Sequence, residues 1–347
     1  MSNGNNAIRK LHDVFGSNLS SDTARHGMTN LELEALSKSR KFENGKSPWA
    51  AWESERTSFG KTFRRWAVYP AFLPLFFSSD HYVDMSTASR SNETNPSFKL
   101  YFSWNKIKVD KLKEHDHVNA IHIPHPWTKW RISRRRDDIN AAGTVFFWPH
   151  SHGSLNTHVD SDRVRSELLA LPPRYHPISI MMSAHDINAK KHLQVRELGF
   201  PIVTAGSLNS QKFIDRFYGL VKEFKYGAGN YHGSHVYYCL DFGMPFLILA
   251  DGSLKLEALD GIDVPAGFFD GVSVDYPDLK ERKIYQEWFN SLKLQNYEVS
   301  LSQMEFVKEQ LGYAAETSRL RFALLVWFQF FKHIHLVPGL WWRALRG

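Results

Sequence analysis

The chain has 347 residues, of which 43% are hydrophobic and 23% are charged. This balance excludes a disordered protein, and the length is sufficient for two domains. The formal net charge of +7 favours an anionic partner, such as nucleotide phosphates, nucleic acid or an acidic lipid surface. Cys239 is the only cysteine, which excludes disulfides within the chain and cysteine-based zinc sites, and favours a reducing, cytoplasmic setting.

The N-terminal part of the chain divides into an arm and a small domain. Residues 1–45 are rich in Ser, Asn and charge, with one weak helical pattern at 31–36, which predicts a polar, partly ordered arm without a secretory signal. Residues 46–140 predict a smaller α/β domain, with short strands at 100–104 and 118–123. An apolar segment that precedes these strands ends in Ser78-Ser79-Asp80-His81. The basic run at 131–140 is interpreted as a linker.

The central stretch, residues 144–249, alternates short apolar strands with segments of helical spacing. Strands are expected at 145–148, 177–182, 201–204 and 245–249, and helices at 161–171, 213–224 and 233–243. This alternation predicts a parallel sheet that is covered by helices on both faces. Ligands of such sheets bind beyond the carboxyl ends of the strands. His150 and Ser151 follow the first predicted strand, and His185 and Asp186 follow the second.

Gly233 and Ser234 lie where a helix is expected to begin, and Gly243 lies where it is expected to end. A glycine and a hydroxyl at a helix N-terminus leave backbone N–H groups, aligned with the helix dipole, for a phosphate. Taken alone, the pattern favours an ordinary helix cap formed by Ser234. A further strand is expected between the helix at 213–224 and Gly233, as the fourth of the five in the parallel sheet. The position of Gly233 and Ser234 after this strand makes a phosphate site an equal alternative.

The C-terminal part begins with loops after residue 250, followed by helical patterns at 279–294 and 300–314. Residues 317–347 contain basic side chains and no acid, and the apolar segment 322–331 is shorter than the roughly 20 residues that span a bilayer. The final helix either lies in a membrane interface as an aromatic, cationic element or packs back across the other domain. Both alternatives stay open.

Several classes of site are excluded by missing motifs. The chain has no Walker motif, no G-x-G-x-x-G fingerprint and no G-x-S-x-G elbow, which counts against kinases, nicotinamide enzymes and α/β-hydrolases. Pairs such as His150 with His152, or His115 with His117, lack the setting of a zinc site, so no catalytic metal is expected. The arginine run at 134–136 is unaccompanied by a nucleic-acid-binding motif, so nucleic acid is not an expected partner.

Short motifs occur in a consistent order along residues 65–250. They are Ser78-Ser79-Asp80-His81, Phe147-Trp148-Pro149-His150-Ser151, Tyr175-His176-Pro177-Ile178, Gly199-Phe200-Pro201-Ile202, and Gly233-Ser234 followed by Gly243-Met244-Pro245-Phe246. In these motifs the chain resembles bacterial polysaccharide-biosynthesis glycosyltransferases with the GT-B fold. The resemblance implies an α/β fold of two Rossmann-like domains with parallel sheets facing a cleft. It assigns residues 46–140 to the acceptor side, 141–300 to the nucleotide-sugar-binding domain, and 301–347 to basic, aromatic helices that cross back.

The same resemblance implies roles for individual residues. The donor-binding residues would be His150, Ser151, His185, Asp186, Ser207, Asn230, Gly233 and Ser234, with Ser207, Gly233 and Ser234 on the phosphate. No metal or other cofactor is implied, because helix N-termini and basic side chains neutralise the leaving group. The helix after Ser234 carries only Asp241 where retaining members carry two glutamates, which favours an inverting reaction.

An inverting transfer needs a general base that removes the proton of the acceptor hydroxyl. Asp80 and His81 are the candidate catalytic residues, because they follow an apolar segment in the acceptor-side half. The alternatives are a turn or helix cap for Asp80 and a structural histidine for His81.

The expected function is the metal-independent transfer of a sugar from a nucleotide-sugar donor to a glycan or glycolipid acceptor. The product would be capsule, lipopolysaccharide or a similar surface polysaccharide, made by a cytoplasmic enzyme that is peripheral to the inner membrane. Two alternatives keep the fold: a noncatalytic nucleotide- or sugar-binding protein, and an NDP-sugar epimerase that needs no acceptor.

Overall fold

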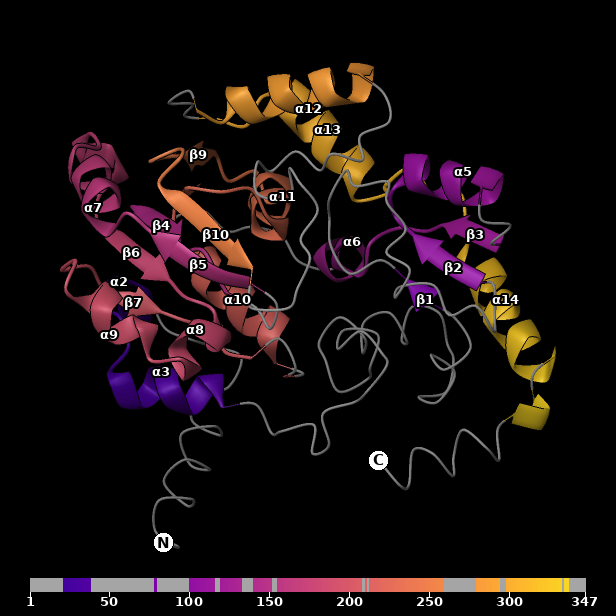
Figure 1. Cartoon of the computed structure of the whole chain (residues 1–347), viewed down its shortest axis with the longest axis horizontal. Coiled ribbons are helices and arrows are strands. Elements are labelled where there is room, and N and C mark those ends of the chain that lie inside the picture. Colours follow the sequence, from indigo (N-terminus) through magenta and orange to yellow (C-terminus); the bar gives the residue numbers. More distant parts are fainter. Residues whose placement is uncertain are drawn as a thin grey trace, which may run out of the picture. The chain divides into compact units, whose positions relative to one another are not determined.

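The computed structural model describes residues 21–38, 78–79, 100–115, 119–132, 140–151, 155–207, 210, 212–258, 279–293, 298–332 and 334–336. The chain forms two compact units (Figure 1). Unit 1 comprises residues 1–39 and 136–307, and unit 2 comprises residues 40–135 and 308–347. The mixed α/β fold with parallel sheets agrees with the prediction, whereas the GT-B arrangement of two domains stays a prediction.

The core of unit 1 is a five-stranded sheet in the order β7-β6-β4-β8-β9. Its strands are β4 (Thr144–Phe147), β6 (Ile178–Met181), β7 (Ile202–Val203), β8 (Tyr226–Gly229) and β9 (Phe246–Ile248). All neighbouring pairs are parallel, and every residue of the five strands is buried. Near-continuous apolar strands of this kind are typical of a parallel sheet that is covered on both faces.

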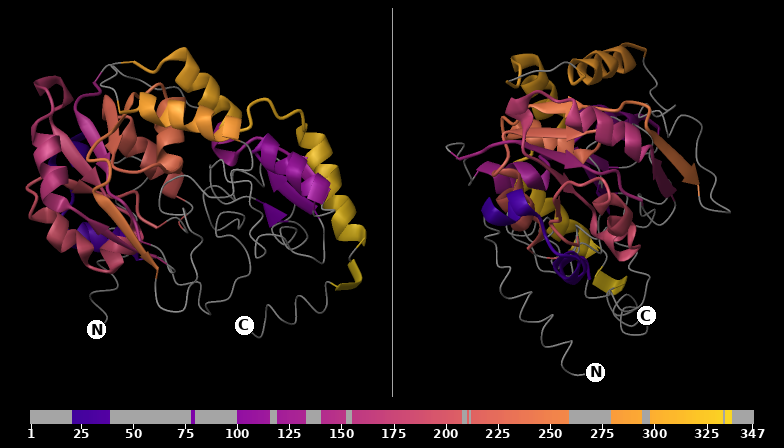
Figure 2. Two further views of the ribbon diagram at one scale, coloured as in Figure 1. Left: turned by 45° about the horizontal axis from the view of Figure 1, so that its top comes forward. Right: turned by 90° about the vertical axis from the view of Figure 1, so that its left-hand side faces the viewer.

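Helices connect these strands and cover the sheet on both sides (Figures 1 and 2). They are α7 (Ser161–Leu169), η2 (Pro173–Tyr175), α8 (Ala184–Asn188), α9 (Lys191–Arg196), α10 (Phe213–Val221) and α11 (Ser234–Asp241). The chain moves outward from β4 through β6 to β7, and then returns to the other side of β4 for β8 and β9. The order therefore reverses between β4 and β8, and such a switch point is where open α/β sheets bind ligands.

Gly143 precedes β4 in a left-handed conformation with φ of +73°. A side chain at this position would collide with the carbonyl oxygen of Pro177, which immediately precedes β6. Glycine is therefore required for the close approach of the two strand starts. The strands follow in register from Thr144 opposite Ile178 to Phe147 opposite Met181.

Residues 21–38 are a folded part of the segment that was predicted as a polar, partly ordered arm. They form α2 (Ser21–His26) and α3 (Asn30–Ser37), which pack on the sheet of unit 1. Ser179 Oγ of β6 donates a hydrogen bond to Ala24 O at 2.7 Å, and Met28 N donates to Ile202 O at 2.8 Å. A capping box joins Thr29 and Glu32 at the start of α3. This part of the predicted arm is therefore an integral layer of unit 1.

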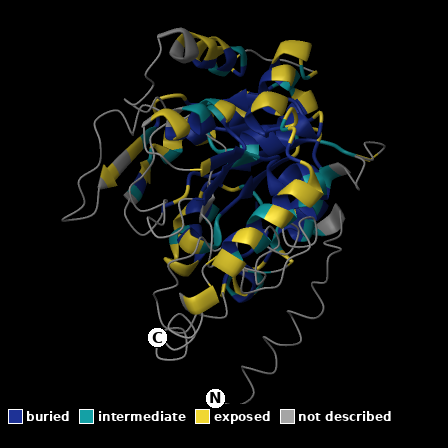
Figure 3. Ribbon diagram, turned by 90° about the vertical axis from the view of Figure 1, so that its right-hand side faces the viewer, coloured by how far each residue is buried: buried dark blue, intermediate teal, exposed yellow. Residues whose placement is uncertain are grey.

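An antiparallel ribbon of β5 (Leu155–Val159) and β10 (Leu254–Ala258) extends from the carboxyl ends of β4 and β9. The sequence predicted loops after residue 250, so β10 was missed. Two further helices, α12 (Leu279–Ser291) and α13 (Leu301–Gln310), match the helical patterns expected at 279–294 and 300–314. In Figure 3 the central strands are buried and dark blue, whereas exposed, yellow residues lie on the outer faces of the helices and on an outlying strand.

Unit 2 contains a parallel three-stranded sheet of β1 (Ser78–Ser79), β2 (Leu100–Ser103) and β3 (Asn119–His122). Its helices are α5 (Lys106–His115), α6 (Pro126–Ile132), α14 (Arg319–Lys332) and η4 (Ile334–Leu336). The ring of Phe322 on α14 lies 4.4 Å from that of Phe102 on β2. The C-terminal helix thus packs on the N-terminal half of the chain, and the domain boundary at 135/136 falls inside the predicted linker.

Candidate functional site

The candidate site lies at the carboxyl edge of the unit 1 sheet, where the strand order reverses. Phe147 at the end of β4 is paired with Gly229 at the end of β8, so the loops that follow start side by side. His150 in the first loop and Tyr231 in the second are joined by a hydrogen bond of 3.2 Å between Nδ1 and the hydroxyl. This bond spans the switch point.

The β4 side of the site is held by a buried hydrogen-bond network. The carboxylate of Asp186, which is 1% exposed, accepts hydrogen bonds from Ser151 N at 3.2 and 3.3 Å and from Ser183 Oγ at 2.7 Å. Lys191 Nζ donates to Ser151 Oγ and to Asn156 Oδ1, both at 2.7 Å, and lies 3.7 Å from Asp186. Groups of the protein itself thus satisfy the hydrogen-bonding atoms of Asp186 and Ser151. We assign these two residues to holding the loop after β4.

The β8 side consists of stacked rings around His235. Its imidazole stacks on Phe147 with 4.6 Å between centroids and lies 4.8 Å from the ring of Tyr231. Burial, followed by the charges of His150 and His232, lowers the pKa of His235 well below its ordinary value. His235 is therefore neutral at pH 7. Its Nε2 is buried and has no hydrogen-bond partner in the described part of the chain.

His232 lies in an aromatic box on the same side. The rings of Tyr237, Tyr285 and Trp288 lie 5.1, 5.3 and 5.5 Å from its imidazole. Burial in this box lowers the pKa of His232 to about 4. Neither His232 Nε2 nor Trp288 Nε1 has a hydrogen-bond partner among the described residues. This half of the site therefore contains buried polar atoms that internal contacts do not satisfy.

Helix α11 begins at the switch point without a side-chain cap. The N-cap residue is Gly233, and Ser234 is the first helical residue, so the prediction of a cap formed by Ser234 is wrong. The Ser234 hydroxyl instead bonds to the side chain of Tyr238. A Cβ atom on Gly233 would lie 3.0 Å from the His235 ring, which favours glycine here. The first turn carries no acidic residue, so its N–H groups and dipole favour an anion.

The other predicted donor-binding residues follow different strands of the sheet, and only Asn230 lies directly at the switch point. His185 is exposed in α8 beyond β6, and Ser207 is buried beyond β7, the outermost strand of the sheet. Asn230 directly follows β8; its Nδ2 donates to Ser253 Oγ at 2.8 Å, while its buried Oδ1 has no partner in the described regions. Asp80 and His81 lie outside the described residues, so their catalytic role stays a prediction.

Arg216 in the first part of α10 is a buried cation at the same edge. The whole of Arg216 is buried, and none of its guanidinium nitrogens has a hydrogen-bond partner within the described segments. Its Nη2 lies 3.3 Å from the position of a Cβ on Gly206, in the loop after β7. Burial lowers the pKa of Arg216 to about 10, so it stays charged at neutral pH. This charge favours anionic groups near the edge.

Several contributors to the site were missed in the sequence, among them Tyr231, His235 and Lys191. Tyr231 and His235 are each two positions from Gly233 in the sequence. This closeness to the predicted helix start could have identified them as site residues. Lys191 is 40 positions from Ser151 in sequence, and no local pattern connects them. Among the described residues, no cluster of His, Cys, Asp or Glu is arranged to hold a metal; the expectation of a metal-independent reaction stays a prediction.

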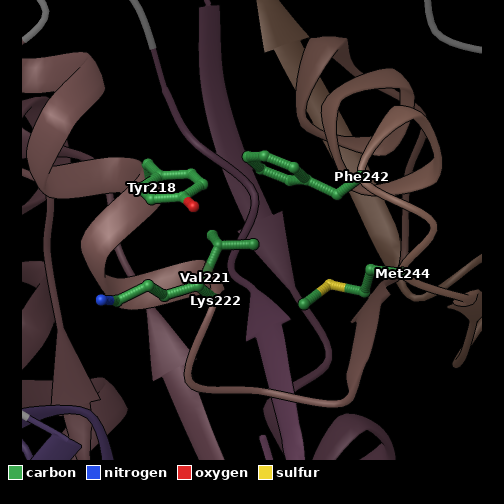
Figure 4. Close-up of a pocket in the computed structure, with 5 residues that line it drawn as sticks. All are labelled: Tyr218, Val221, Lys222, Phe242 and Met244. Atoms are coloured by element: carbon green, nitrogen blue, oxygen red, sulfur yellow. The ribbon is translucent and has the colours of Figure 1, made fainter. Parts of the chain in front are cut away.

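A small apolar depression lies elsewhere in unit 1. Figure 4 shows its lining by Tyr218, Val221, Lys222, Phe242 and Met244. They lie in the second half of α10, at the caps that follow α10 and α11, and in the turn before β9. Both helices run away from the edge where the strands end. The depression is therefore separate from the candidate site.

No protein-family model matches the chain, and neither curated proteins nor solved structures provide a match. Function is therefore inferred from the residues of this chain alone.

Proposed function

We propose that the protein is a glycosyltransferase that binds a nucleotide sugar at the carboxyl edge of the unit 1 sheet and transfers the sugar to a glycan or glycolipid acceptor. The observation that carries the proposal is the switch point between β4 and β8, where the uncapped N-terminus of α11 lies beside Tyr231. A parallel sheet with this reversal favours a nucleotide, and an uncapped helix start favours its phosphates.

The surrounding groups suit such a ligand. The neutral imidazole of His235 offers both a donor and an acceptor for hydrogen bonds. The exposed His150 ring, bonded to Tyr231, can contact a phosphate or sugar hydroxyl beside the helix start. Asn230 adds an unsatisfied carbonyl oxygen, which would accept a hydrogen bond from a ligand hydroxyl or base.

The first test is thermal unfolding in the presence of UDP-, GDP-, dTDP- and CMP-sugars and of the free nucleotides, with and without EDTA. A ligand at a hundred times its Kd adds about 2.7 kcal/mol to stability. We expect one nucleotide class to raise the melting temperature, and EDTA to leave that shift unchanged. No shift with any nucleotide would overturn the proposed donor site.

The position of the site is tested by two exposed histidines. We expect His150→Ala, at the switch point, to weaken nucleotide binding about fivefold, because one hydrogen bond to the ligand contributes about 1 kcal/mol. His185→Ala, beyond β6 on the far side of β4 from the switch point, is the matched control and should bind as the unmodified protein does. The reverse result would move the site to the β6 end.

Transfer itself is tested at Asp80. If this residue is the general base, Asp80→Asn should leave nucleotide binding intact and reduce transfer of the sugar to the acceptor at least a hundredfold, which is the ordinary contribution of general base catalysis. A protein that binds one nucleotide sugar but releases neither nucleotide nor sugar with any offered acceptor would be a noncatalytic binding protein. Conversion of the free nucleotide sugar without acceptor would indicate an epimerase.

A further inference from the structure

Helix α14 has two apolar faces on opposite sides, of which only one is used by the fold. The inner face carries the buried residues Phe322, Val326 and Gln329. Its contact with the unit 2 sheet includes the Phe322 ring, 4.4 Å from that of Phe102. This face fixes the helix to unit 2 and leaves the opposite face outward (Figure 1).

The outer face of α14 is an exposed apolar stripe. Leu320, Leu324, Phe328 and Phe331 are 68%, 59%, 63% and 62% exposed. Their spacing of four, four and three residues places them on one side of the helix. Leu320, Leu324 and Phe328 also line a shallow hollow beside Trp327. A contiguous exposed apolar patch of this kind marks an interaction surface.

The charges on α14 identify the partner. Arg319, Arg321 and Lys332 are exposed on the same helix, and residues 317–347 contain no acidic side chain. A second copy of the chain would bring an identical set of cations against this one, which disfavours pairing through the stripe. An anionic surface that also accepts apolar side chains matches both features, and a bilayer with acidic headgroups is such a surface.

We propose that α14 docks on an anionic membrane surface, with its axis in the plane of the interface and the Leu320–Phe331 stripe inserted among the acyl chains. The basic side chains at both ends of the stripe then lie at the level of the headgroups. The 14 residues of α14 are fewer than the roughly 20 that cross a bilayer, so the proposed element lies in the interface. Docking of this kind brings the enzyme to an acceptor carried on a lipid.

The test is co-sedimentation of the full chain with two kinds of vesicle. One kind is phosphatidylcholine alone, and the other contains about 30 mol% phosphatidylglycerol, which makes its surface anionic. We expect binding to the anionic vesicles, weakened by raised salt, and little binding to the neutral ones. Phe328→Glu should reduce binding at least tenfold. Arg321→Gln should reduce it about fivefold, since each basic residue near such a surface contributes about 1 kcal/mol.

The matched control is Leu301→Glu, because Leu301 is 83% exposed on α13 and lies outside the stripe. This variant should bind vesicles as the unmodified protein does. Thermal unfolding of Phe328→Glu should be unchanged, since the replaced ring is exposed, and its nucleotide binding should also be unchanged. Absence of binding to anionic vesicles, or equal loss in Leu301→Glu and Phe328→Glu, would overturn the proposal. A concentration-dependent dimer that Phe328→Glu abolishes would instead assign the stripe to a second copy.

Discussion

The two sides of the switch point differ in how their buried polar groups are satisfied. On the β4 side, Asp186, Ser151 and Lys191 bond to one another and to neighbouring groups. On the β8 side, the Nε2 atoms of His232 and His235 are buried without partners in the described part of the protein. The loops of the two sides are joined by the hydrogen bond between His150 and Tyr231.

This difference separates a scaffold from a binding surface. A buried polar atom that makes no hydrogen bond costs about 1–3 kcal/mol, so native proteins keep such atoms where a ligand or ordered water satisfies them. The bonded network after β4 therefore fixes the geometry of the edge, and we propose that the unsatisfied atoms after β8 recognise a ligand. Under this proposal Asp186 contributes to stability, whereas Asn230 and His235, with Tyr231 beside them, contribute to binding.

The largest expected effect comes from breaking the scaffold. Asp186→Ala should lower the free energy of unfolding by about 3 kcal/mol, because it leaves Ser151 N and Ser183 Oγ without an acceptor and Lys191 without its counter-charge. Chemical denaturation at pH 7 measures this loss. The control is Asp162→Ala on α7, where the aspartate is exposed in the first helical turn.

Asp162→Ala should change stability by less than about 1 kcal/mol. Equal losses in the two variants would contradict a structural role for Asp186. An Asp186→Ala protein that is as stable as the unmodified chain but no longer binds nucleotide would return this carboxylate to the ligand site.

A second effect, on the order of 2–3 kcal/mol, is expected from pH on the β8 side. The pKa of His232 in the folded protein is about 4, against an ordinary value near 6.5. The folded state therefore binds fewer protons than the unfolded state between these values, so stability is full above pH 6.5 and falls as the pH drops towards 4. His235 adds to this acid sensitivity, since burial lowers its pKa as well.

His232→Phe should remove the part of the pH dependence of stability that His232 causes. We expect the difference in unfolding free energy between pH 7 and pH 4 to shrink by about 2–3 kcal/mol in this variant. Tyr285→Phe, which changes the same aromatic box without removing an imidazole, is the control and should keep the full difference. An unaltered slope in His232→Phe would show that His232 is solvated and protonates freely in the folded state.

The fold of unit 1 was predictable where local patterns carry the information. Strands of apolar residues, punctuated by Pro, Gly and polar turns, predicted the parallel sheet and the carboxyl edge that we propose as the ligand site. The ribbon of β5 and β10 was missed because it pairs Leu254 with Val159, and pairing between such distant segments leaves no local signal. The weak helical pattern at 31–36 coincides with α3, which the capping box of Thr29 and Glu32 begins. The helix at 21–26 was missed because polar composition outweighed any local helical signal.

The site was predictable at the level of the segment but not of each residue. The glycine pattern located the start of α11, yet it assigned the cap to Ser234 although Gly233 occupies that position. Polar residues after strands were all predicted to face a ligand, because sequence gives position along the chain and not burial. Asp186 and His185 are adjacent in sequence, but the first is buried and bonded and the second is exposed.

The smallest expected effect tests the bond that joins the two sides. Tyr231→Phe removes the hydroxyl that bonds to His150 and keeps the ring that packs against His235. Burial, with the negative charge of Asp186 as a second cause, raises the pKa of this hydroxyl, so it stays protonated and available to donate. The free energy of unfolding should change by less than about 1 kcal/mol, while nucleotide affinity falls about fivefold because His150 loses its orienting partner.

The matched control for Tyr231→Phe is Tyr218→Phe, which removes a hydroxyl in the depression of Figure 4, away from the switch point. Titration calorimetry with the nucleotide identified by the thermal screen compares the two variants. Equal affinities would show that the hydroxyl bond does not position His150 for the ligand. A loss in Tyr231→Phe alone, without loss of stability, would mean that binding depends on the junction between the bonded β4 side and the unsatisfied β8 side.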